Sequence, residues 1–309
     1  MAKKEIVIGT RGSRLALWQA NFVAESLKQF TDAEIIIKKI KTQGDKILDS
    51  PLAKIGDKGL FVKEIEVALS TGEADLAVHS MKDVPTELPV GLKISSILKR
   101  EDPRDVLISK GGVCLSDLPK GSKVGTSSLR RKAQLLNFRP DLKIVDVRGN
   151  IDTRLQKMES GEFDAIILAA AGIDRMGWAD KITERIAMEI SLPAVGQGAI
   201  GIETRESDDI INKLVEKINH VSTFTAVAAE RAMMKKLEGG CQIPIGALGV
   251  LEENCINLWG MVASLDGKRL IRDFVSGKSS EAEELGIKLA EQMIKSGAKE
   301  ILKEIRESG

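Results

Sequence analysis

The chain has 309 residues, of which 43% are hydrophobic and 29% charged, and its 46 basic and 45 acidic side chains nearly cancel. This balance gives no overall attraction to nucleic acid or to an anionic membrane, so anion binding must come from local clusters. The longest apolar runs, such as residues 165–173, are too short to span a bilayer, and the N-terminal residues lack the apolar region of a signal peptide. We therefore expect a cytosolic protein with two or three domains.

Short apolar runs alternate with longer amphipathic segments through the first two-thirds of the chain. This pattern predicts α/β domains with largely parallel sheets. The expected strands lie at 6–10, 34–40, 74–80, 122–126, 143–148 and 165–170, and the expected helices at 15–30, 61–72, 129–139 and 150–161.

The final third has a different pattern, which predicts a small α+β domain. A helix at 223–240 precedes strands that run from 245–250 to 270–275, and a long charged helix at 280–306 closes the chain. The glycine-rich segment 194–205 resembles a strand that returns to the first domain. We therefore predict domain 1 at 1–99 plus 197–218, domain 2 at 100–196 and domain 3 at 219–309.

The segment 41–60 has three glycines, a proline and many charges, but no clear periodicity. Long loops of this kind are usually functional or disordered. A lid over a binding site and a solvated surface loop are equally good interpretations of its composition.

Arginines recur where the predicted strands end and the next helices begin. Free N–H groups at helix N-termini bind anions, and guanidinium groups pair bidentately with carboxylate or phosphate. Taken singly, each arginine is explained as a surface residue, but their recurrence in successive α/β units favours an anion cleft. No phosphate-loop motif is present, so carboxylates are as plausible as phosphates. The residues concerned are Arg11, followed by Ser13, and then Arg130, Arg131, Arg148, Arg154 and Arg175.

Asp83 follows another predicted strand end and precedes Pro85. A carboxylate there could stabilise a cation or relay a proton, although capping a turn is the commoner use of such an aspartate. His79 lies within the apolar strand, which favours a buried, hydrogen-bonded histidine over a catalytic one.

The three cysteines, Cys114, Cys241 and Cys255, are widely spaced and form no C-x-x-C pair, so neither a disulfide framework nor a metal site is expected. Cys241 follows two glycines after a predicted helix, so an exposed turn could hold it as a nucleophile beside cationic groups. We interpret Cys114 and Cys255 as inert packing residues.

Six segments, in this order, resemble the signature segments of the porphobilinogen deaminase family. The resemblance covers essentially the whole chain and is far more specific than a single motif. The segments are TRGSRLALWQA (10–20), VHSMKDVPTELP (78–89), GTSSLRR (125–131), RGNIDTRL (148–155), LPAVGQGAIGIE (192–203) and GGCQIPIGA (239–247).

The resemblance implies two domains like type II periplasmic binding proteins plus a small α+β C-terminal domain. It implies a transferase of tetrapyrrole biosynthesis that joins four porphobilinogen molecules into hydroxymethylbilane and releases ammonia. It also implies a dipyrromethane cofactor bound to Cys241 by a thioether, porphobilinogen as the small-molecule substrate, and a cytoplasmic monomer with no nucleic-acid or membrane partner.

The resemblance also assigns roles to individual residues. Asp83 is expected to be the catalytic carboxylate and to contact the cofactor. Lys54 and Lys58 would belong to the segment 41–60. The other expected cofactor ligands are Lys82, Thr126, Ser127, Ser128, Arg130 and Arg131, and the expected substrate ligands are Arg11, Ser13, Arg148, Arg154 and Arg175.

Two rival functions remain open at the level of sequence. A reversible binding or sensor protein would suit the first 200 residues, because a fold does not fix a function. A cysteine-dependent acyl transferase would need a base near Cys241, and neither His79 nor His220 lies in an evident dyad motif.

Overall fold

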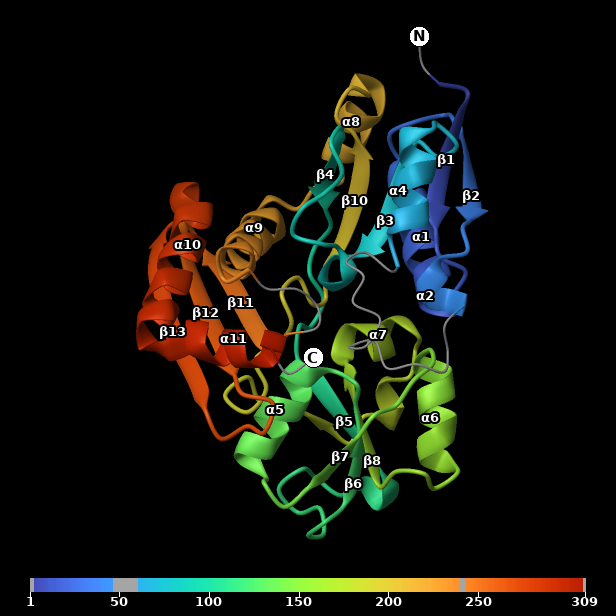
Figure 1. The fold of residues 1–309 in the computed structure, drawn as a ribbon. Coiled ribbons are helices and arrows are strands. Elements are labelled where there is room, and N and C mark those ends of the chain that lie inside the picture. Colours follow the sequence, from blue (N-terminus) through green and yellow to red (C-terminus); the bar gives the residue numbers. More distant parts are fainter. Residues whose placement is uncertain (1–2, 47–60, 239–242, 308–309) are drawn as a thin grey trace. The chain divides into compact units, whose positions relative to one another are not determined.

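The computed structural model of the chain describes residues 3–46, 61–238 and 243–307 (Figure 1). They form two compact units: residues 3–46, 61–101 and 199–224 in one, and residues 102–198 with the described residues from 225 onward in the other. The predicted α/β class is confirmed, with two sheet domains and a small C-terminal sheet domain. The residue boundaries of three separate domains stay a prediction. Within the described ranges, no helix is both long and apolar enough to cross a membrane.

The first unit is built on a five-stranded sheet with the order β2-β1-β3-β10-β4. Its strands are β1 (Glu5–Thr10), β2 (Glu34–Lys39), β3 (Leu76–Ser80), β4 (Leu92–Ile97) and β10 (Ile200–Arg205). Its helices are α1 (Arg14–Leu27), α2 (Gln43–Lys46), α4 (Lys63–Ser70) and α8 (Asp209–Glu216), with a 3₁₀ turn η1 (Met81–Asp83) after β3.

Both faces of this sheet are covered by apolar helix faces. Ile8 and Val78 pack with Val23 of α1 and Ile211 of α8 in one cluster. In a second cluster, Ile65 and Leu69 of α4 pack with Ala77 and Leu92. Burial on both faces explains why these strands read as nearly continuous apolar runs.

The second unit contains a five-stranded sheet with the order β7-β6-β8-β5-β9. Its strands are β5 (Asp105–Ser109), β6 (Lys123–Gly125), β7 (Lys143–Val145), β8 (Ala165–Ala169) and β9 (Glu184–Arg185). Its helices are α5 (Leu129–Phe138), α6 (Ile151–Glu159) and α7 (Ala170–Arg175), with 3₁₀ turns η2 (Lys110–Gly112) and η3 (Ala179–Lys181).

The prediction of largely parallel sheets is wrong. β1 runs parallel to β2 and β3, but β10 runs antiparallel to β3 and β4. Likewise, β6 runs parallel to β7 and β8, but β5 runs antiparallel to β8 and β9. The strands β5 and β10 each follow a point where the chain passes from one unit to the other, and each enters its sheet in the opposite direction.

A three-stranded antiparallel sheet follows, formed by β11 (Ile245–Glu252), β12 (Cys255–Ala263) and β13 (Leu270–Lys278). Helix α9 (Val221–Lys236) precedes it, and η4 (Ser279–Glu281), α10 (Ala282–Met293) and α11 (Lys299–Glu307) follow. The single helix expected at 280–306 is wrong, because a π-helical segment at Ile294–Ala298 holds Gly297 at a φ of 99°. A left-handed residue of this kind interrupts a regular helix.

The interpretation of Cys255 as a packing residue is also wrong. It is the first residue of β12, it is exposed, and its Sγ lies 3.1 Å from Ser276 Oγ. The neighbouring Ile256 and Leu258 fill the core instead. Cys114 is half-buried.

Candidate functional site

A pocket lies in the first unit, where β1 and β3 end at Thr10 and Ser80. The carboxyl ends of parallel strands meet at one edge of a sheet, where ligands usually bind in open α/β folds. The pocket measures about 420 Å³, including space open to solvent. The structure therefore brings three predicted site residues together. The lining residues are Arg11, Ser13, Leu15, Ala16, Gln19, Phe61, Val62, Val78, His79, Ser80 and Asp83.

Arg11 and Ser13 give one side of the pocket a positive character. Ser13 is the N-cap of α1, and its Oγ accepts a hydrogen bond from the Ala16 backbone N–H at 3.2 Å. The Arg11 guanidinium carbon lies 4.2 Å from the ring centroid of Phe61, a cation–π contact. A helix N-terminus beside a guanidinium favours an anionic ligand. Sequence reasoning missed Phe61, because nothing in its local pattern distinguishes it from a core residue.

Asp83 reaches the same pocket through the turn that follows β3. The preceding Met81 is 1% exposed and anchors the turn in the core, while the Val84 N–H donates to the Met81 carbonyl at 3.2 Å. Asp83 is half-buried at the pocket wall. Lys82 lies in the same turn but is not among the pocket-lining residues. The anchored turn thus holds a carboxylate in the same pocket as Arg11.

His79 is buried and hydrogen-bonded, as expected from the sequence. Its Nε2 lies 2.9 Å from Glu203 Oε2, and the two side chains are 4% and 1% exposed. Glu66 of α4 belongs to the same group, because burial and the negative charge of Glu203 raise its pKa to about 7, against an opposing effect of His79. Sequence reasoning did not single out either glutamate, because both lie in segments that read as ordinary sheet and helix.

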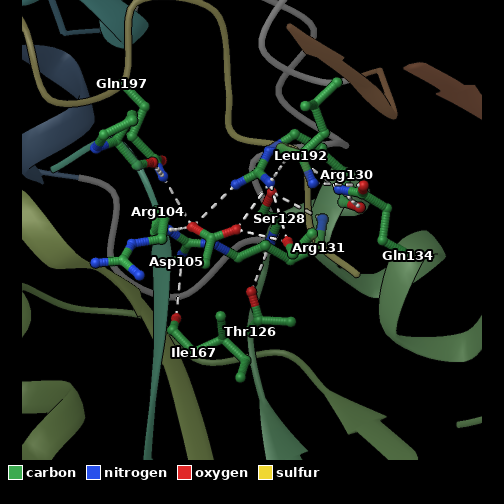
Figure 2. Close-up of polar contacts among 12 residues, drawn as sticks. Arg104, Asp105, Thr126, Ser128, Arg130, Arg131, Gln134, Ile167, Leu192 and Gln197 are labelled. Carbon is green, nitrogen blue, oxygen red and sulfur yellow. Dashed lines mark hydrogen bonds and ion pairs between the residues drawn. The ribbon is translucent and has the colours of Figure 1, made fainter. Parts of the chain in front are cut away.

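The second unit holds the predicted cofactor ligands Arg130 and Arg131, which are 4% and 6% exposed. Both guanidinium groups bind the carboxylate of Asp105 at the start of β5 (Figure 2). Arg130 Nη1 lies 2.8 Å from Asp105 Oδ2, and Arg131 Nε lies 2.9 Å from Asp105 Oδ1. Ser191 and Gln197 donate to the same carboxylate at 2.8 and 2.9 Å.

These bonds fix the charge of the cluster. Burial alone would raise the pKa of Asp105, but the guanidinium groups of Arg130 and Arg131 hold that pKa well below its usual range. Arginine stays protonated in proteins, so two positive charges face one negative charge. The Nε of Arg130 is buried and has no hydrogen-bond partner among the described residues. Sequence reasoning missed Asp105, which lies close to the predicted boundary between domain 1 and domain 2.

The hydroxyl groups before α5 hold the turn that carries the two arginines. Ser128 is the N-cap of α5 and accepts from the Arg131 N–H at 3.4 Å. Thr126 Oγ1 accepts from the Ser128 N–H at 3.3 Å, and Ser127 Oγ donates to the Val147 carbonyl at 2.6 Å. All three predicted ligands therefore also make local structural bonds.

The remaining predicted substrate ligands lie around the ends of α6 and α7. Arg154 Nε donates to the Gly149 carbonyl at 2.8 Å, and Arg175 Nη2 donates to the Gly198 carbonyl at 2.7 Å. Both are half-buried, as is Arg148, which lies between β7 and α6. Cys241, Lys54 and Lys58 lie outside the described residues, as does most of the segment interpreted as a lid or surface loop.

The fold and these residues define an α/β protein that is equipped to bind an anionic ligand beside a carboxylate. Residues 6–213 match the family described as "Porphobilinogen deaminase, dipyromethane cofactor binding domain", and residues 224–295 match "Porphobilinogen deaminase, C-terminal domain". The chain belongs to the porphobilinogen deaminase family, whose members are enzymes of tetrapyrrole biosynthesis with a dipyrromethane cofactor.

Relatives of similar length support this assignment. The chain is 54% identical over 306 residues to the porphobilinogen deaminase of Geotalea uraniireducens, covering 99% of this chain and 96% of the relative. It is also 54% identical to that of Pelotomaculum thermopropionicum, covering 99% and 98%.

Solved structures with more distant similarity include the VFT2 domain of Bordetella pertussis BvgS, at 16% identity and a TM-score of 0.43, covering 74% of this chain and 91% of that one. A putative methionine-binding lipoprotein from Bacillus subtilis matches at 14% identity and a TM-score of 0.44, covering 70% and 90%.

Proposed function

We propose that this chain joins four porphobilinogen molecules head to tail into hydroxymethylbilane and releases one ammonia at each step. The growing chain is carried by a dipyrromethane cofactor bound to Cys241 through a thioether. The observation that carries this proposal is the pocket that gathers Asp83 with Arg11 and Ser13. Each porphobilinogen bears an acetate and a propionate, so a pocket with one guanidinium group, a helix N-terminus and one carboxylate matches its chemistry.

In this proposal, Arg11 and the N-terminus of α1 hold substrate carboxylates. Charge-assisted hydrogen bonds of this kind contribute roughly 1.5–3 kcal/mol each. Arg148, Arg154 and Arg175 bind the other carboxylates of the substrate and the elongating chain. Asp83 accepts hydrogen bonds from pyrrole N–H groups and stabilises the positive charge that develops when ammonia leaves.

The donor set of the second unit fits the cofactor. Arg130 and Arg131 carry two positive charges, and the described residues pair them with one negative charge, that of Asp105. The unpartnered Arg130 Nε supplies a donor, and a carboxylate of the cofactor would neutralise the cluster. Thr126, Ser127 and Ser128 complete the proposed ligands of this unit, and Lys82 is a proposed ligand in the first unit. When bound, the cofactor supplies the free α-carbon of its terminal pyrrole as the nucleophile.

The decisive experiment is the intact mass of the purified protein beside a Cys241→Ser variant. We expect a mass excess equal to two condensed porphobilinogen units in the parent and none in the variant. Cys255→Ser is the matched control, because that exposed cysteine should be replaceable without loss of the excess. An unmodified, inactive parent after incubation with porphobilinogen would favour a reversible binding protein instead.

A second experiment tests Asp83. The Asp83→Ala variant should still carry the cofactor mass but should release no ammonia from porphobilinogen. Near-normal turnover would refute the proposed role of this carboxylate. We also propose a cytoplasmic monomer, which size-exclusion chromatography with light scattering tests for the oligomeric state.

A further inference from the structure

Three buried ionisable side chains form a cluster that adjoins the pocket. As whole residues, Glu66 of α4, His79 of β3 and Glu203 of β10 are 8%, 5% and 0% exposed. Glutamate is almost never fully buried unless it is paired. His79 is the member shared by the two features, because it lines the pocket with Asp83 and also contacts Glu203 at 2.9 Å.

The strand register explains how the cluster forms. In the antiparallel pair of β3 and β10, His79 lies opposite Gly201, and Glu203 lies opposite Ala77. Directly opposed residues point to the same face of a sheet, so His79 and Glu203 share a face. Ala77 belongs to the apolar cluster that includes Ile65 and Leu69 of α4, so α4, which carries the buried Glu66, packs over that face.

The cluster is able to gain and lose a proton near neutral pH. Burial and the charge of Glu203 raise the pKa of Glu66 to about 7, while His79 opposes this rise. The Glu203 Oε1 atom is buried and has no hydrogen-bond partner among the described residues. An extra proton therefore has acceptors within the cluster.

Other charged side chains lie around the cluster. On the pocket side these are Asp83 and Arg11. Arg205, the next charged residue of β10, donates hydrogen bonds to the backbone carbonyls of Leu69 and Ala74. Among the described residues, His79 is the group that opposes the rise in the pKa of Glu66.

We propose that His79, Glu203 and Glu66 form a proton relay that restores the charge of Asp83 between successive condensations. This inference rests on the proposed function. In each condensation the C–N bond of porphobilinogen breaks, and ammonia leaves with its electron pair. A C–C bond forms from the pyrrole α-carbon, which then loses its proton while the C–H electrons restore the aromatic ring. Asp83 accepts that proton, the cluster takes it over, and it is finally released to solvent, where ammonia becomes ammonium.

The reaction requires that Asp83 be ionised again before each condensation, and the relay provides for this. Asp83 stabilises positive charge only while it is ionised, and the reaction uses this carboxylate repeatedly. Glu66, whose pKa is raised to about 7, takes over that proton through His79 and Glu203 and so returns Asp83 to the ionised form. His79, Glu203 and Glu66 thus affect the reaction through the ionisation of Asp83.

The test is the pH dependence of turnover in a Glu66→Gln variant, with Glu73→Gln as the matched control. Glu73 lies just beyond the end of α4 and forms an exposed pair with Lys38. In the parent and the control, kcat should rise with pH through about 7 as Glu66 ionises. The Glu66→Gln variant should match the parent below pH 6 and lose this rise, so that its kcat is roughly tenfold lower above pH 8. KM should not change.

A spectroscopic measurement follows the cluster without turnover. The chain has two histidines, so the ring NMR signals of His79 are identified by comparison with a His220→Gln variant. These signals should change as Glu66 ionises near pH 7 in the parent, and this change should vanish in Glu66→Gln. A His79→Gln variant should lose the same rise in kcat.

The outcomes separate the relay from the function on which it rests. An active parent whose Glu66→Gln and His79→Gln variants keep the pH-dependent rise would overturn the relay alone. So would a uniform decrease in kcat at every pH, which is the signature of a structural role, or His79 ring signals that do not change as Glu66 ionises. A parent that releases no ammonia would refute the proposed function itself.

Discussion

Replacing Asp105 by asparagine would leave two buried arginines without an opposing charge. Asp105 is fully buried and accepts hydrogen bonds from Arg130, Arg131, Ser191 and Gln197. Removing one partner of a buried ion pair costs about 3–5 kcal/mol, because the remaining charge has lost its compensation. For a unit of this size, that loss corresponds to a decrease in Tm of roughly 6–20 °C.

The assay is chemical and thermal unfolding of the parent, of Asp105→Asn and of a surface control, Glu159→Gln. Glu159 forms an exposed pair with Lys181 at 3.3 Å, and such pairs contribute little to stability. The control should therefore unfold like the parent. The pH dependence gives a second check, because the pKa of Asp105 is held below its usual range. Its contribution is complete above the unfolded-state pKa of about 3.9 and is lost only as pH falls toward the folded-state pKa.

The difference in unfolding free energy between the parent and Asp105→Asn should thus be constant from pH 5 to pH 8. A loss below about 1 kcal/mol, within the range of ordinary substitutions, would refute the buried charge cluster as described. A difference that varied strongly over this pH interval would contradict the lowered pKa.

Three further predictions use the same logic. Glu66→Gln should remove a pH dependence of the unfolding free energy. Because the pKa of Glu66 is raised in the folded state, its stabilising contribution is complete below the unfolded-state pKa of 4.5 and is lost as pH rises through about 7. This contribution is at most about 3 kcal/mol. Urea unfolding at pH 5 and pH 8 measures it, and equal slopes for parent and variant would contradict it. Gly286→Ala should destabilise the C-terminal helices by about 1–3 kcal/mol, because its Cβ would lie 2.2 Å from the Ala229 carbonyl oxygen, and an unchanged Tm would refute this close contact. Arg148→Ala or Arg175→Ala should raise KM for porphobilinogen at least about tenfold, or stall elongation; unchanged kinetics and intermediates in both would refute the assignment of carboxylate ligands.

Much of the secondary structure follows from local patterns in the sequence. The expected strand at 6–10 and helix at 15–30 correspond to β1 and α1, and the expected strand at 165–170 corresponds to β8. Side-chain periodicity and capping residues act over a few positions, so they are readable without the fold. Short buried strands such as β5 lack alternation and were missed for that reason.

Part of the pocket was also determined by the sequence. Arg11 and Asp83 each follow a strand end, and parallel strands bring such residues to one edge of a sheet. The sequence motifs likewise identified the family, because they are specific and occur in the correct order along the chain. Neither inference needed the contacts of any individual side chain.

The partners of the side chains were decided only by the tertiary structure. Arg130 and Arg131 read as ligand-binding residues, yet they meet Asp105, which lies 25 and 26 positions away on an antiparallel strand. His79 contacts Glu203, 124 positions away, because the antiparallel strands β3 and β10 pair with each other. The direction in which β5 and β10 enter their sheets has no local signal, because it depends on how the chain crosses between its two units. Long-range pairing therefore determines which charges are buried together, and the sequence determines which residues are available for that pairing.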